Sequence, residues 1–136
     1  MKNWIKNFNK LATTENRRLA LAIAEAGLES INTQEVIARA ISLQNNVLSI
    51  MGKSFDLSEF KKIKVIGFGK ASLNAAVALE KILGSKIKTG AVVGLSKVNL
   101  DYIEAFAGTH PRPSQINVEA GERIYEIIKD SNEKDL

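Results

Sequence analysis

The order of elements in the second half of the chain constrains the fold most. A run rich in β-branched residues over 63–66 ends in two closely spaced glycines. A helical pattern over residues 71–83 and a second β-rich run over 87–95 follow. Strand, helix and strand in this order predict a βαβ unit over about 63–95, with two parallel strands and a right-handed crossover.

Two helices are expected before this unit. Apolar residues at three- and four-residue spacing, among them Leu19, Ile23 and Leu28, predict an amphipathic helix over about 14–30. Asn32 and Glu35 form a capping box, which predicts that a second helix starts near Thr33 and extends over about 33–50.

A third strand and a last helix are expected after the βαβ unit, over about 103–131. The strand candidate begins at Ile103 and ends before Gly108. The side chains of the last helix that we expect to face inward are Val118, Ile124, Tyr125 and Ile128.

Together these elements predict an α/β fold, a three-layer α/β/α, Rossmann-like domain with a mostly parallel sheet. The 136 residues suit a single domain over 1–136. Three strands are few for such a sheet, and residues 131–136 change from polar to apolar like a loop entering another strand. We therefore expect an incomplete domain, truncated or completed by a partner, whose exposed sheet edge allows a homo-oligomer.

Composition narrows the function classes. The chain has no cysteine, which excludes a disulfide framework, a thiolate metal site and a cysteine nucleophile. The net charge is +4, but the basic residues do not cluster, so we expect no nucleic-acid partner. The longest uninterrupted apolar run covers only residues 19–24, which predicts a cytoplasmic protein without a membrane partner. The carboxylates have no metal-ligand spacing, so no metal site is expected within this chain.

The glycine turn after the first strand is one candidate site. Gly67, Gly69, Lys70 and Ser72 stand between a strand and a helix, where unpaired N–H groups and the helix dipole favour phosphate. The spacing matches neither a Walker A loop nor a dinucleotide fingerprint. A lysine in the first turn of a helix opposes the dipole, and a bound anion would offset that cost. The alternative is that Lys70 extends into solvent and that the glycines serve only the tight turn.

The loop after the third strand is the other candidate site. It contains Thr109, His110, Arg112 and Ser114, and its two prolines restrict the residues before them. The planar fork of Arg112 suits a carboxylate or phosphate, and His110 can donate a hydrogen bond or move a proton. The alternative is a loop that only leads into the last helix, with Ser114 as its cap. If the first and third strands lie side by side or one apart, both loops open at the carboxyl edge of the sheet.

The two loops together carry a resemblance to a known family. The run from Lys64 to Ser72, KVIGFGKAS, is followed by the run from Ala107 to Ser114, AGTHPRPS, and by a helix that opens with Asn117. This pair resembles the amino-terminal part of the glycerate 2-kinase family of the MOFRL type, and the likeness covers nearly all 136 residues. Family members are much longer, so the resemblance implies a truncated chain that corresponds to roughly the first third.

The resemblance implies a Rossmann-like domain that helps to enclose a cleft, and transfer of the ATP γ-phosphate to the 2-hydroxyl of D-glycerate with a divalent metal. Lys70 would be the catalytic lysine. The residues implied in binding substrate or phosphate are Gly67, Gly69, Ser72, Thr109, His110 and Arg112, although the position of Arg112 is often apolar in the family. Mg²⁺ ligands would lie outside this chain, and the chain alone would be inactive.

Two other functions remain open. A strand followed by Gly-x-Gly is also compatible with a hydroxypyruvate reductase-like enzyme that uses NAD(P), although a third glycine and a ribose-binding acid are missing. The chain could instead be a non-catalytic domain that binds a phosphorylated metabolite or assembles with itself through its sheet edge.

Overall fold

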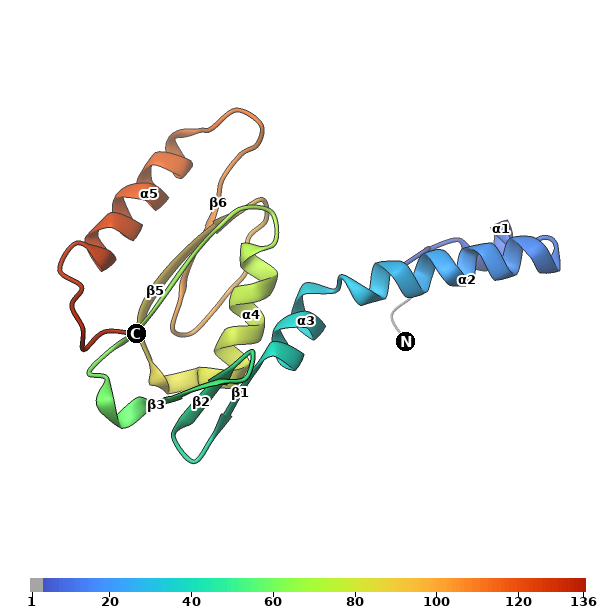
Figure 1. Cartoon of the computed structure of the whole chain (residues 1–136). Coiled ribbons are helices and arrows are strands. Elements are labelled where there is room, and N and C mark those ends of the chain that lie inside the picture. The colour runs from blue at the N-terminus through green and yellow to red at the C-terminus, as the bar shows by residue number, and fades with distance from the viewer. Residues whose placement is uncertain (1–3) are drawn as a thin grey trace.

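The computed structural model describes residues 4–136 and contains two sheets (Figure 1). The antiparallel sheet contains β1 (Ile41–Gln44), β2 (Val47–Ile50) and β3 (Lys53–Asp56), and the parallel sheet has the order β4 (Ile63–Phe68), β5 (Ile87–Gly94), β6 (Glu104–Ala107). The helices are α1 (Phe8–Leu11), α2 (Glu15–Ser30), α3 (Thr33–Ala40), α4 (Ser72–Leu83) and α5 (Gln115–Ile128). Two short 3-10 turns lie at η1 (Leu57–Glu59) and η2 (Gly84–Lys86).

The parallel sheet is covered on both faces, with α4 on one side and α5 on the other (Figure 1). This arrangement confirms the predicted three-layer, Rossmann-like α/β/α fold. The middle strand β5 is the most buried, and Ala91 and Val92 are at most 1% exposed. Close packing depends on glycine at position 90, where a Cβ would lie 2.7 Å from the carbonyl oxygen of Val65 on β4.

The last three residues, 134–136, lie alongside β4 on the edge that β5 leaves free. The N–H of Leu136 donates to the carbonyl of Lys62 at 2.9 Å, and the N–H of Lys64 donates to the carbonyl of Leu136 at 2.8 Å. Lys62 and Asp135 form a parallel bridge. β4 therefore lies between β5 and a later parallel segment, so the strand order reverses at β4. Open α/β sheets bind ligands outside the carboxyl ends of the strands at such a reversal.

A salt bridge fixes this segment to β4. The Nζ of Lys64 lies 2.7 Å from Oδ2 of Asp135, and the two side chains are 10% and 4% exposed. The hydrogen bond from Lys64 is the main cause that lowers the pKa of Asp135 below its ordinary value of 3.8.

The prediction of a helix over 33–50 is wrong beyond residue 40. Asn32 does cap α3, because its side chain accepts a hydrogen bond from the N–H of Gln34 at 3.2 Å. The chain then forms the antiparallel sheet, with a tight turn at Asn45 and Asn46, whose φ values are +45° and +70°. Asparagine tolerates this left-handed conformation. Residues in that conformation cannot continue a right-handed helix.

Helix α2 forms where the sequence predicts the first amphipathic helix, but the side chains of its apolar stripe are exposed. The side chain of Thr14 accepts a hydrogen bond from the N–H of Arg17 and caps α2. No residue of α2 is buried, and Leu19 and Ile23 are 61% and 66% exposed. Helices α1 and α2 project from the rest of the molecule (Figure 1).

The inward face of α5 also differs from the prediction. Val118, Tyr125 and Ile128 are exposed, whereas Ala120 and Ile127 are buried. Ile124 is half-buried and lies on the same side of the helix as Ala120 and Ile127, so it is the one of the four predicted residues on the covered side. None of the helices within residues 4–136 is long and apolar enough to cross a membrane.

Candidate functional site

A pocket of about 330 Å³ lies at the carboxyl edge of the parallel sheet. Its lining comes from the turn after β4, the end of β5, the loop after β6 and the start of α5. The lining residues are Phe68, Gly69, Lys70, Val93, Gly94, Leu95, Thr109, His110 and Asn117. The two candidate loops thus meet at one cavity, because β5 lies between the two strands that precede them.

The turn after β4 is held by its own hydrogen bonds. Gly69 has a φ of +110°, a conformation that L side chains rarely adopt. The hydroxyl of Ser72 donates to the carbonyl oxygens of Gly69 at 2.8 Å and of Val93 at 2.7 Å, which fastens the turn to β5. The turn is therefore fixed in place before any ligand binds.

The sequence had suggested that Lys70 belongs to the first turn of a helix. In the structure, Lys70 lies just before α4. Ala71 is the N-cap, and no side chain caps the helix. The lysine is exposed and lines the pocket. Lys70 thus stands next to the N-terminus of α4 without being part of the helix. A lysine charge and the positive end of the helix dipole both favour an anion at this edge.

The loop after β6 is closed by hydrogen bonds at both ends. The hydroxyl of Thr109 donates to the carbonyl of Arg112 at 2.7 Å. Oδ1 of Asn117 accepts hydrogen bonds from the N–H groups of Thr109 at 3.0 Å and of Ser114 at 2.9 Å. Ser114 is the N-cap of α5, so its predicted capping position is confirmed.

Four of the seven predicted site residues line the pocket, namely Gly69, Lys70, Thr109 and His110. The other three do not. Gly67 packs under the turn, where a Cβ would lie 2.9 Å from a methyl carbon of Val92. The hydroxyl of Ser72 is bonded to backbone carbonyls, and Arg112 contributes its carbonyl to the loop while it is absent from the lining.

Sequence reasoning missed Asn117 and the end of β5 as parts of the site. The end of β5 could have been inferred, since a middle strand must bring its carboxyl end between the loops of its two neighbours. Asn117 stands at the third position of α5, three residues after Ser114, and this spacing is typical of a side chain that reaches back to the N-cap.

The charge of the pocket favours an anionic ligand. Its lining contains the cation Lys70 and no carboxylate. The residues described, 4–136, include no group of three or more histidine, aspartate or glutamate side chains that could hold a metal ion. The pocket lining therefore offers no carboxylate oxygen to Mg²⁺.

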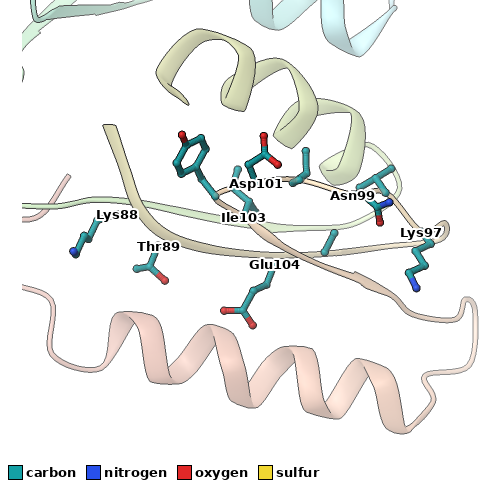
Figure 2. Close-up of a pocket in the computed structure, with 11 residues that line it drawn as sticks. Lys88, Thr89, Lys97, Asn99, Asp101, Ile103 and Glu104 are labelled. Atoms are coloured by element: carbon teal, nitrogen blue, oxygen red, sulfur yellow. The ribbon is translucent and has the colours of Figure 1, made fainter. Parts of the chain in front are cut away.

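A second cavity of about 610 Å³ follows the free edge of β6 and the connection before it. Figure 2 shows that its side chains diverge: Lys88, Thr89 and Glu104 lie on the side of α5, whereas Asp101 lies on the side of α4. Glu104 is also engaged in an ion pair with Arg123. Side chains on opposite sides of a sheet cannot converge on one ligand, so the first pocket is the stronger candidate.

Three proteins similar to this chain are glycerate kinases. Residues 19–136 match the family described as "Domain of unknown function (DUF4147)". A glycerate 2-kinase from Picrophilus torridus is 30% identical over 135 residues, which make up 97% of this chain and 30% of that protein. A glycerate kinase from Danio rerio is 32% identical over 73 residues, or 54% of this chain and 14% of that protein.

A solved structure shares the fold. The crystal structure of a protein from Pyrococcus horikoshii superposes with a TM-score of 0.75 at 22% identity, covering 90% of this chain and 28% of that one. A glycerate 2-kinase from the same organism is 24% identical over 123 residues, or 88% of this chain and 27% of that protein. The chain thus spans at most 30% of the length of these relatives.

Proposed function

The chain belongs to the DUF4147 domain family, the amino-terminal region of glycerate 2-kinases, and from this premise we propose that it contributes to the phosphorylation of D-glycerate. In this reaction the 2-hydroxyl oxygen of D-glycerate forms a bond to the γ-phosphorus of ATP. The bond from that phosphorus to the bridging oxygen of ADP breaks, so that ADP leaves, and the hydroxyl proton passes to solvent. The site's task is to position both substrates and stabilise the negative charge.

The observation that carries the proposal is the meeting of Lys70 with the loop after β6 at one pocket without a carboxylate. In our proposal the ammonium of Lys70 stabilises charge on the transferred phosphoryl group, which makes it the catalytic residue. Gly69 lets the phosphate approach the backbone, because it has no side chain on the pocket side.

His110 would bind the other anionic group from the opposite wall. Thr109 would hold the loop that carries His110, because its hydroxyl and its N–H both donate within that loop. His110 has a ring that can donate a hydrogen bond to a carboxylate or phosphate oxygen. The volume of about 330 Å³ is at the lower end of ordinary ligand pockets, which suits a three-carbon acid or a phosphoryl group better than a whole nucleotide. Gly67 and Ser72 would act indirectly, by shaping the turn that carries Lys70.

No step is assigned to Mg²⁺, because the pocket lining contains no carboxylate. We also propose that the chain alone does not catalyse the reaction. It spans 30% of the length of the Picrophilus torridus relative, and one wall of a cleft does not complete the surroundings of a transferred phosphoryl group.

The test is a chimera in which this chain replaces the matching segment of the Picrophilus torridus glycerate 2-kinase. We expect the chimera to phosphorylate D-glycerate with ATP and the 136-residue chain alone to show no turnover. Lys70→Ala in the chimera should lower kcat by about 10²–10³-fold, the usual cost of losing one charge-stabilising group.

The matched control is Lys81→Ala, which removes an exposed lysine in the last turn of α4, the helix that follows Lys70. A folded chimera that keeps full activity with Lys70→Ala would refute the role of Lys70. Saturable binding of NADH without binding of ATP would favour the reductase interpretation instead.

A further inference from the structure

The side chain of Asn117 holds the loop after β6 at two points that lie five residues apart. Its Oδ1 accepts from the N–H of Thr109 at 3.0 Å and from the N–H of Ser114 at 2.9 Å, and the hydroxyl of Ser114 donates to it at 3.1 Å. The Nδ2 of Asn117 donates to the carbonyl of Thr109 at 3.4 Å. One carboxamide therefore closes the loop that contains His110.

The sheet and α5 fix the carboxamide in turn. Asn117 belongs to the first turn of α5, which packs on β5 and β6. Below it lies Gly108, which is buried and whose N–H donates to the carbonyl of Gly94 at 2.8 Å. A Cβ at position 108 would lie 2.6 Å from Nδ2 of Asn117 and 2.9 Å from its Cγ. Glycine at 108 thus leaves the space that the carboxamide occupies.

The charge of this side chain also matters, because Asn117 lines the same pocket as Lys70. Aspartate has nearly the same shape and accepts hydrogen bonds at least as well, but it would bring a negative charge to the pocket. Asparagine supplies the acceptor without that charge.

We propose that Asn117 is a positioning residue that closes the loop from Thr109 to Ser114 over the pocket, and that this position requires a neutral acceptor so that an anion can bind beside Lys70. The second half of this inference rests on the proposed function, and the first half does not.

The test compares Asn117→Ala and Asn117→Asp in the 136-residue chain with two readouts. The first is hydrogen exchange of the Thr109 and Ser114 amides. The second is the affinity for inorganic phosphate, followed by the NMR signal of His110, which is unique because the chain has one histidine. Asn117→Ala, which removes the carboxamide, should speed hydrogen exchange of both amides about tenfold. It should also weaken phosphate binding about tenfold.

Asn117→Asp separates the two halves of the proposal. It should keep the exchange rates of the parent chain and still bind phosphate about tenfold more weakly, because of its charge. A merely structural role for Asn117 would leave the phosphate affinity of this variant unchanged, which would overturn the requirement for neutrality.

Gly108→Ala is an independent probe of the same contact. It should reproduce the effects of Asn117→Ala, and the double variant should be no worse than either single one, since both remove the same interaction. Asn99→Ala, at an exposed position outside this pocket, is the matched control and should change neither readout.

The outcomes separate the two proposals. Unchanged amide exchange in Asn117→Ala would overturn the positioning role whatever phosphate does. If the parent chain binds no phosphate while exchange responds as expected, the proposed function and the neutrality requirement fail, and the positioning role stands.

Discussion

Two helices of this chain, α4 and α2, both have apolar residues at helical spacing but lie in different surroundings. In α4, Leu73, Ala76 and Leu83 are buried, and all three belong to the main core, which includes residues of the parallel and the antiparallel sheet. In α2 no residue is buried. A periodic pattern thus predicts a helix with an apolar face, while what covers that face depends on the fold around it.

The largest expected effect comes from the same substitution made in both helices. Leu83→Ala should lower the free energy of unfolding by about 2–5 kcal/mol, because it leaves a cavity among packed side chains. Leu19→Ala should change it by less than about 0.5 kcal/mol, since Leu19 is 61% exposed and alanine suits a helix well. Urea denaturation of the two variants measures the difference.

Similar losses in the two variants would break the comparison. They would show that the face of α2 around Leu19 and Ile23 is covered in solution, and the contrast between the helices would not hold. Ile23→Ala is the second variant for that face and should behave like Leu19→Ala.

Two glycine-to-alanine substitutions test the same contrast between the sheet and α2. Their expected effects are smaller than those above and have opposite signs. Gly90→Ala should destabilise the fold by about 1–3 kcal/mol, because the added methyl meets the backbone of β4. Gly27→Ala should instead stabilise α2 by up to about 1 kcal/mol, since nothing lies within 4 Å of its Cβ position and alanine favours helix.

Thermal unfolding measures the first substitution, and hydrogen exchange of the α2 amides measures the second. A stabilising effect of Gly90→Ala would contradict the close approach of β5 to β4. Faster exchange in α2 with Gly27→Ala would contradict its open surroundings.

The smallest effect concerns the carboxyl-terminal segment that pairs with β4. Because Lys64 lowers the pKa of Asp135, this carboxylate stabilises the fold above its ordinary pKa of 3.8. The contribution is lost as the pH falls from about 4 through the lower pKa of the folded state. Asp135→Asn should therefore be less stable at pH 7 and lose less stability on acidification than the parent chain.

Urea midpoints at pH 7 and pH 3 measure this difference. Asp130→Asn, an exposed neighbour, is the control and should keep the pH dependence of the parent chain. An Asp135→Asn chain with that same dependence would show that the salt bridge with Lys64 does not act on stability.

Much of the parallel sheet could be predicted from the sequence because its signals are local. The β-rich runs and glycines around 63–69 and 87–94 specify strands and a turn without reference to distant residues. The antiparallel sheet was missed because Ile41 and Leu48 fit a helical spacing as well as a strand. The pair Asn45 and Asn46 was the turn signal that should have decided.

The candidate site, too, could be predicted from the sequence only in part. The meeting of Lys70 with His110 follows from parallel strands, which place their carboxyl ends at one edge. The absence of Arg112 from the lining could not be predicted, because it depends on how the loop after β6 closes. That closure depends on Asn117, whose partners lie three and eight residues away.

The most direct test of the account is a titration of the 136-residue chain with inorganic phosphate, observed through the NMR signal of its single histidine. We expect saturable binding that Lys70→Ala weakens at least about tenfold, the cost of losing one charged hydrogen bond, while Lys81→Ala has no effect. Equal affinity in the Lys70→Ala variant and the parent chain, or no response of His110 to phosphate, would contradict an anion site between the two loops.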